Sequence, residues 1–196
     1  ALKRENVELV TDKVVRITPK GVVTADGREH EADVLIYGTG FQASNFLSFL
    51  KVKGRGGRDL HESWGGDARA YLGITHPGFP NFFTIYGPNT NIVVNGSIIF
   101  FSECAVRYIL GCLKLLAETG AAAMEPKQKV YDEFNRKVDE ANAGWAWGSP
   151  HVSSWYKNQF GRVSQNWPFG LIDYWRATLA PNADDFVLER TPEPVA

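Results

Sequence analysis

The turn Gly38-Thr39-Gly40 follows a continuous apolar run, residues 34–37. Such a run, apolar at every position instead of at alternate ones, predicts a strand covered on both faces, as in a parallel α/β sheet. Glycine has no Cβ and tolerates positive φ, so a ligand or another backbone can approach closely at this turn. A tight turn out of a buried strand explains the same glycines without any ligand, and the residues alone favour that simpler interpretation.

A second turn of this kind, Gly87-Pro88-Asn89, follows a second predicted buried strand at residues 82–86. A helix is expected soon afterwards, with Ser97 as its N-cap and apolar residues at helical spacing up to about Glu118. Free N–H groups and the helix dipole stabilise negative charge at a helix start. The turn therefore either directs this helix at an electron-rich ligand or is a simple turn, and both interpretations remain open. In α/β sheets, ligands bind beyond strand ends of this kind.

The remaining elements follow from periodicity and from turn residues. Strands are expected at residues 7–10 and 13–18, and residues 21–37 read as strand, Asp26-Gly27 turn and strand, which makes the first forty residues β-rich. A second helix is expected over residues 126–142, and a short one before Pro181. The chain after Asn182 is polar and contains proline, which predicts a loose tail.

Composition narrows the classes of partner. The 196 residues are 44% hydrophobic and 13% aromatic, enough to bury one sizeable core. The 21 basic and 22 acidic residues give a net charge of −1, which offers no basic field for nucleic acid. Charges interrupt the helix at residues 97–118, so it is not expected to enter a membrane. Small molecules and protein surfaces are the expected partners.

The reactive residue types point to no self-contained active site. Cys104 and Cys112 lie eight residues apart in one predicted helix, which favours reduced thiols and a cytoplasmic location. The four histidines lack metal-ligand spacing, and no nucleophile elbow is present, so we assign neither a metal site nor a catalytic residue. The glycine-rich fingerprints that hold dinucleotide or nucleotide phosphates are also absent.

Three stretches together resemble one enzyme family. Residues 33–41, "DVLIYGTGF", resemble a motif of flavin-containing monooxygenases. The stretches "YLGITHPGFPNFFTIYGPNTN" and "GSIIFFSECAVRYI" are similar to the C-terminal half of Baeyer–Villiger monooxygenases. The closing "SSWYKNQFGRVSQNWPFGLIDYWR" resembles the branch that includes hydroxyacetophenone monooxygenase, so that the resemblance covers about residues 5–185.

The resemblance implies a fold and an activity. The fold class is α/β, the C-terminal part of a flavoprotein with two dinucleotide-binding domains, with a β-rich N-terminal segment and a helical C-terminal part. Residues 1–40 would be the returning part of the NADP-binding lobe, residues 41–185 the C-terminal part of the FAD-binding lobe with its helical cover, and residues 186–196 a loose tail. The family uses FAD and NADPH to insert one oxygen atom of O2 into a ketone.

The resemblance also implies a set of cofactor-binding residues. Gly38, Thr39 and Gly40 would lie close to FAD, on the turn that joins the two lobes. The turn from Gly87 to Asn91 would lie at the flavin ring, and Trp155 matches a tryptophan that contacts NADP, with Arg162 on the same segment. The full set is Gly38, Thr39, Gly40, Gly87, Pro88, Asn89, Asn91, Ser97 and Trp155. Without the resemblance, a core aromatic residue is the simpler interpretation of Trp155.

Several parts of the family's machinery are expected N-terminal to the residues present. These are the FAD and NADP fingerprints and an active-site arginine, and the sequence begins without an initiator Met, as a cut within a longer protein would. We therefore expect a fragment that is inactive alone, whose exposed apolar faces pair with the missing N-terminal half or with a second copy. The alternative is a non-catalytic binding or assembly module derived from the same fold.

Overall fold

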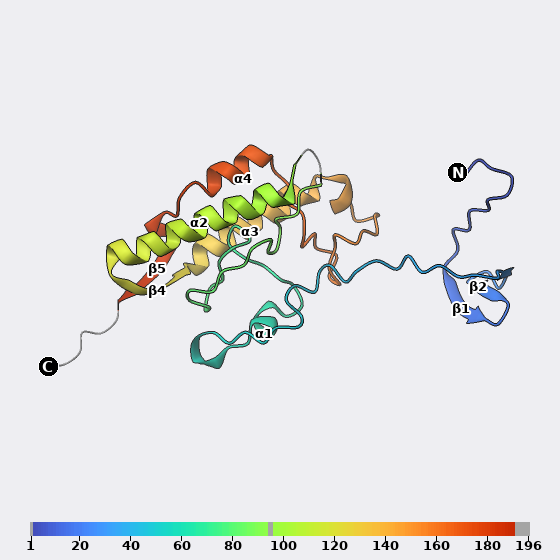
Figure 1. Cartoon of the computed structure of the whole chain (residues 1–196), viewed down its shortest axis with the longest axis horizontal. Coiled ribbons are helices and arrows are strands. Elements are labelled where there is room, and N and C mark those ends of the chain that lie inside the picture. The colour runs from blue at the N-terminus through green and yellow to red at the C-terminus, as the bar shows by residue number, and fades with distance from the viewer. Residues whose placement is uncertain (1, 94–95, 191–196) are drawn as a thin grey trace. The chain divides into compact units, whose positions relative to one another are not determined.

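The computed structural model describes residues 2–93 and 96–190, and the chain divides into two compact units, Ala1–Phe41 and Gln42–Ala196 (Figure 1). Each unit is described by itself. The boundary falls one residue from the division expected between residues 40 and 41.

The first unit is built on a three-stranded antiparallel sheet in the order β1 (Val14–Thr18), β2 (Gly21–Thr24) and β3 (Glu29–Glu31). The hairpin between β2 and β3 turns at Asp26-Gly27, as predicted, and Gly27 has a φ of 86°. The Thr24 hydroxyl donates to the Asp26 carboxylate over 2.6 Å, and this bond, together with those from Arg28, lowers the pKa of Asp26 to about 2. The strand predicted at residues 7–10 does not form.

The predicted buried strand before Gly38 is wrong. Residues 33–41 have no regular secondary structure, and the Ile36 side chain is 93% exposed. An apolar run becomes a buried strand only where neighbouring strands and a covering layer exist, and the described residues of this unit pair no strand with it. The strand predicted at residues 82–86 is also wrong, since a single bridge between Thr75 and Phe83 replaces it.

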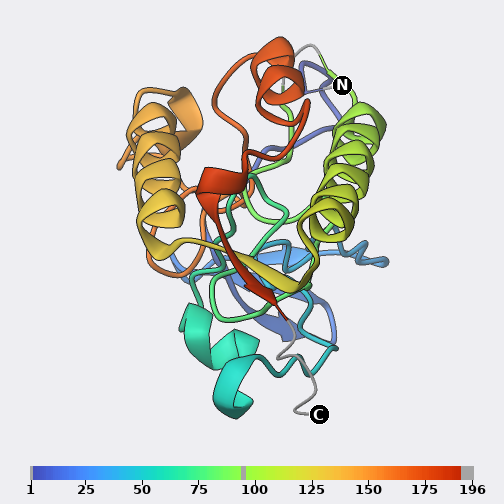
Figure 2. The same ribbon diagram turned by 90° about the vertical axis from the view of Figure 1, so that its left-hand side faces the viewer.

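The described residues of the second unit form four α-helices: α1 (Leu60–Trp64), α2 (Ile98–Thr119), α3 (Gln128–Ala143) and α4 (Leu171–Ala177). Figure 2 shows α2 and α3 on either side of an antiparallel ribbon of β4 (Ala121–Pro126) and β5 (Phe186–Arg190). Single 3₁₀ turns lie at Arg55–Gly57, Ala146–Gly148 and Ala183–Asp185. The expected loose tail is thus wrong for its first five residues, which pair as β5; residues 191–196 lie outside the described residues.

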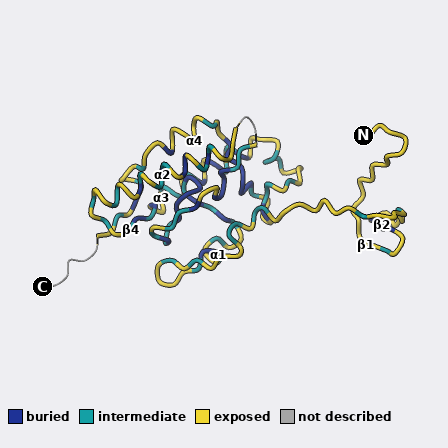
Figure 3. Tube along the Cα trace, viewed as in Figure 1, coloured by how far each residue is buried: buried dark blue, intermediate teal, exposed yellow. Residues whose placement is uncertain are grey.

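Helix α2 confirms the predicted helix and its cap. The Ser97 side chain accepts a hydrogen bond from the Ile99 amide over 3.2 Å, and the helix ends at Gly120, which is left-handed at φ 66°. One face of α2 carries the core, with Phe101 stacked on Tyr174 of α4 at a ring distance of 4.2 Å. Buried residues are concentrated beneath the helices of this unit (Figure 3). No helix of the described residues is long and apolar enough to span a bilayer.

The two cysteines lie on that buried face and are unpaired by any disulfide, in agreement with the expected reduced thiols. Burial raises the pKa of the Cys112 thiol to about 12, which leaves it protonated at neutral pH. Within residues 2–93 and 96–190, no group of His, Cys, Asp and Glu side chains could hold a metal ion.

Candidate functional site

The second glycine turn is attached along its length to a distant segment, residues 163–167. The Asn89 and Asn91 backbone amides donate to carbonyls of that segment over 3.0 and 2.8 Å, and the Trp167 amide donates back to the Asn91 carbonyl over 2.8 Å. The Asn91 side chain adds a bond of 2.9 Å to Asn166. This pairing fixes the turn without help from a regular sheet.

Asn89 holds the turn from within the protein. Its side chain is buried, its backbone is left-handed at φ 58°, and its amide nitrogen donates to the Val163 and Asn166 carbonyls over 2.8 and 3.1 Å. Its amide oxygen accepts a bond of 2.9 Å from Arg162. The polar atoms of Asn89 are therefore committed to the protein, so this predicted cofactor-binding residue is placed to shape the turn.

Arg162 is the centre of a charged network behind the turn. Its guanidinium pairs with Asp67 at 2.5 Å and with Asp139 of α3 at 3.1 Å, and it donates to the Ala68 carbonyl over 2.6 Å. Arg69 bridges the same two carboxylates at 2.9 and 2.7 Å. The Arg162 side chain is only 11% exposed, so it holds segments together instead of facing a cofactor.

Gly87 is required by close packing. A Cβ at this position would overlap the Gly73 carbonyl oxygen and lie 2.7 Å from the Thr84 hydroxyl. That hydroxyl donates to the Gly73 carbonyl over 2.8 Å and lies 3.0 Å from Nε2 of the buried His76. Burial lowers the pKa of His76 to about 4, so this support of the turn is neutral at pH 7.

Pro88 is buried between Gly87 and Asn89, whereas the predicted residues away from this turn are accessible. A Cβ at Gly38 or Gly40 would meet nothing within 4 Å, and Gly40 has a φ of 72°. Thr39 between them is exposed. Trp155 is 59% exposed, against the interpretation as a core aromatic residue, and its carbonyl accepts a 2.7 Å bond from Gln165 on the segment that pairs with the second turn. Ser97 and the first residues of α2 are also exposed.

The structure thus brings some of the predicted residues together. The turn Gly87-Pro88-Asn89, Asn91 and Trp155 are all tied to residues 163–167 within one unit. The turn Gly38-Thr39-Gly40 belongs to the other unit, and its position relative to them stays a prediction.

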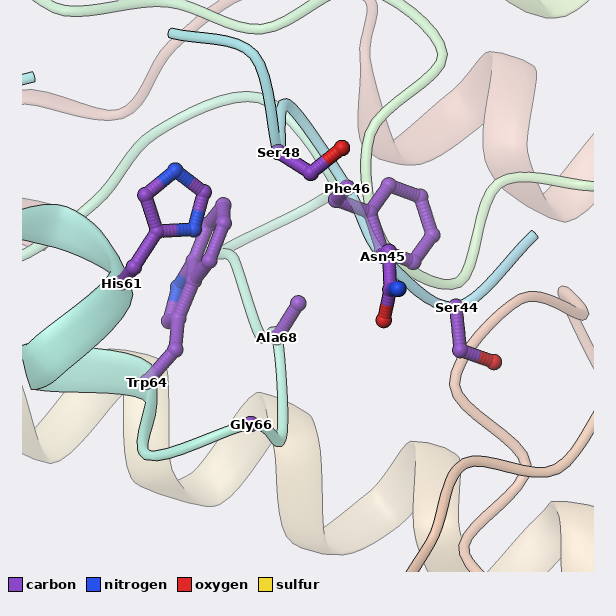
Figure 4. A pocket seen from close by; sticks show the side chains of 8 residues that line it. All are labelled: Ser44, Asn45, Phe46, Ser48, His61, Trp64, Gly66 and Ala68. Atoms are coloured by element: carbon purple, nitrogen blue, oxygen red, sulfur yellow. The ribbon is translucent and has the colours of Figure 1, made fainter. Parts of the chain in front are cut away.

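Two cavities that the sequence did not reveal share the walls Phe46 and Trp64. The more polar one, about 130 Å³, is shown in Figure 4, where His61 and Trp64 of α1 face the segment that bears Ser44 and Phe46. The second, about 180 Å³, lies against residues 82–88 and is mostly apolar. The aromatic residues of segments 44–50 and 82–86 were the available signal, but nothing in their spacing showed that the segments meet.

Comparison with known proteins finds relatives that are named as monooxygenases. A Baeyer-Villiger monooxygenase of Pseudomonas aeruginosa is 34% identical over 98% of this chain and 36% of its own length. The FAD-binding monooxygenase ktnD of Aspergillus niger is 36% identical over 96% of this chain and 31% of its own length. No protein-family model matches the chain. The chain is related to the Baeyer–Villiger monooxygenases.

Solved structures of monooxygenases agree with this relationship. The closed crystal structure of cyclohexanone monooxygenase matches 96% of this chain and 36% of its own, with a TM-score of 0.76 and 28% identity. Oxidized steroid monooxygenase bound to NADP matches with a TM-score of 0.74 and 28% identity, over 96% of this chain and 36% of its own. The expected α/β fold and the resemblance to flavin-dependent monooxygenases are confirmed. The chain spans about a third of the length of the relatives that it matches.

The described residues fit one side of a flavin cofactor. They supply a fixed glycine turn and the capped N-terminus of a 22-residue helix, where N–H groups favour partial negative charge. They supply no glycine-rich phosphate loop, as the sequence already indicates.

Proposed function

We propose that this chain is part of an FAD- and NADPH-dependent monooxygenase that carries out Baeyer–Villiger oxidation of a ketone, and that it is inactive by itself. The observation that supports the proposal is the fixed turn at residues 87–91, which precedes a capped helix in a chain whose relatives are named for this chemistry. When bound, FAD with NADPH supplies reduction and activation of O2.

The residues of the second unit divide into two roles. The buried Gly87 and Pro88 set the course of the turn that is proposed to face the flavin ring, and the N-terminus of α2 at Ser97 favours negative charge on that ring. The side chains of Asn89 and Asn91 are bonded to other residues of the unit, and we propose that they support the cofactor site by fixing the turn from behind. The exposed Trp155 is the proposed contact for NADP.

In the first unit, Gly38, Thr39 and Gly40 form the proposed second contact with FAD. Residues 1–40 then belong to the NADP-binding lobe, and residues 41–185 to the FAD-binding lobe. The phosphate-binding fingerprints would come from sequence outside this chain, which is why the chain alone is expected to lack activity.

A non-catalytic assembly role is the second candidate, and one surface favours it. Helix α2 exposes an apolar stripe at i, i+7, i+11 and i+14, comprising Ile99, Val106, Leu110 and Leu113. Exposed stripes of this kind mark protein–protein contacts. In the assembly role the stripe pairs with another chain, and sedimentation that shows a monomer at every concentration would contradict a second copy as the partner.

Flavin retention tests the main proposal. The purified chain is incubated with FAD, desalted and measured by absorbance, with and without a separately expressed polypeptide that contains the first two thirds of the Pseudomonas aeruginosa relative. The chain alone should be colourless, and the mixture should retain flavin and oxidise NADPH in the presence of a ketone. Retention of one flavin by the chain alone would contradict the need for the outside sequence, and a colourless, inactive mixture that nonetheless co-purifies would favour the assembly role.

A further inference from the structure

The apolar cavity of the second unit is formed by two segments that face each other. Phe46, Leu47 and Leu50 line one side, residues 82–88 line the other, and the Trp64 indole contributes a further wall. None of the residues that line it carries a charge. Such a lining favours apolar over charged ligands, because it offers apolar contacts and no partner for a charge.

Two residues of the lining hold uncommon backbone conformations. Leu47 and Tyr86 have φ values of 52° and 55°, in the left-handed region that costs an ordinary residue about 1–2 kcal/mol. The Tyr86 hydroxyl donates to the Asn91 side chain over 2.9 Å, which ties that wall to the fixed turn. Strained residues of this type are enriched at ligand sites, where the surrounding structure stabilises a backbone conformation that the site requires.

The volume limits the ligand. A cavity of about 150 Å³ lined by apolar side chains accepts benzene. The present cavity of about 180 Å³ has room for one six-membered ring and a few further atoms, and its rim residues Leu50, Ile85 and Tyr86 are 42–52% exposed. Gly87 and Pro88 border both this cavity and the turn proposed to contact FAD.

We propose that this cavity binds a single-ring, uncharged apolar molecule, either aromatic or alicyclic. Binding requires only side chains of this unit. It therefore does not depend on FAD, NADPH or the proposed oxidation, and the two proposals can fail separately.

The test is calorimetric and NMR titration of the whole chain with toluene, and with benzoate as a charged molecule of similar size. Toluene should bind with a stoichiometry near one, and benzoate at least tenfold more weakly. Leu50→Phe places a ring into the cavity from a position that is 42% exposed, and should weaken toluene binding at least tenfold. Leu110→Phe makes the same change on the exposed stripe of α2, outside the cavity lining, and should leave toluene binding unchanged.

A second substitution that fills the cavity keeps the test decisive if Leu50→Phe does not fold. Ile85→Phe changes the opposite wall at another exposed position, and it should reproduce the effect of Leu50→Phe if the circular dichroism spectrum is native. Absence of saturable toluene binding, equal affinity for benzoate, or binding that survives both filling variants would overturn the proposal.

Discussion

The two glycine turns look alike in the sequence and differ in the structure. The turn at Gly87 is bordered by buried polar residues, and hydrogen bonds tie it to a segment more than seventy residues away. At Gly38 an added Cβ would have no neighbour within 4 Å, and the apolar run before it is exposed. A strand–glycine pattern therefore shows where backbone access is possible, but it does not show whether the same chain fixes the geometry.

The support behind Gly87 has three layers. Asn89 fixes the turn, Arg162 fixes Asn89, and two carboxylates hold Arg162. Separately, the Thr84 side chain packs against Gly87 and is itself in hydrogen-bond contact with His76. Breaking each layer in turn measures how much of this wall the chain builds by itself.

The largest effect is expected from Arg162→Ala. The substitution removes a nearly buried cation from the half-buried Asp67 and Asp139 and leaves the Asn89 amide oxygen without its donor. The free energy of unfolding of the second unit should fall by about 4 kcal/mol, because two ion pairs and the bonds to Asn89 and to the Ala68 carbonyl are lost together. Urea denaturation followed by tryptophan fluorescence measures the loss.

The matched control for Arg162→Ala is Arg136→Ala. Arg136 forms an exposed i,i+4 pair with Glu140 on the outer face of α3, at 2.6 Å. Its loss should cost less than about 1 kcal/mol. Equal effects of the two substitutions would show that the Arg162 network does not support the turn.

Lowering the pH should destabilise the second unit through His76, which supports the Gly87 turn by its contact with the Thr84 hydroxyl. Its pKa is about 4 in the folded protein, against 6.5 for an unperturbed histidine, so the unfolded chain binds an additional proton between these values. The free energy of unfolding should be unaffected above pH 6.5 and should fall by roughly 3 kcal/mol as the pH drops to about 4.

Denaturant titrations at several pH values test this prediction. His76→Gln keeps a donor for Thr84 and removes the titrating group. The free energy of unfolding should therefore fall less between pH 6.5 and pH 4 than it does in the unchanged protein, by the contribution of His76. His151→Gln, at an exposed position, is the control and should retain the slope. An unchanged slope in His76→Gln would contradict a buried neutral imidazole at this site.

The sequence predicted helices better than sheets for a physical reason. The helix capped by Ser97 satisfies its hydrogen bonds internally, so its cap and its apolar spacing were sufficient to locate it. The runs at residues 34–37 and 82–86 could become strands only with partner strands, which the described residues do not provide. Strand β5 was missed because the polar, proline-containing stretch around it concealed a pairing with Ala121–Pro126.

The candidate site was predicted in part, for the same reason. Glycine, proline and asparagine after an apolar run indicated a turn, and the family resemblance indicated its importance. The contacts of Arg162 with Asp67 and Asp139 join residues 95 and 23 positions apart, and no local pattern encodes them. The two cavities likewise depend on segments that meet only in the folded chain.

The smallest effect is expected from replacing a glycine by alanine. Because the same substitution can be made in both turns, it also compares them most directly. Gly87→Ala places a methyl group against the Gly73 carbonyl and the Thr84 hydroxyl, and it should lower the free energy of unfolding by about 2 kcal/mol. Gly38→Ala meets no atom within 4 Å and does not need a positive φ, so its effect should stay within about 0.5 kcal/mol. Thermal and urea unfolding of both variants measure the difference. If the two substitutions cost the same, the Gly87 turn is not held by packing, and fixed geometry cannot be the property that distinguishes it from the turn at Gly38.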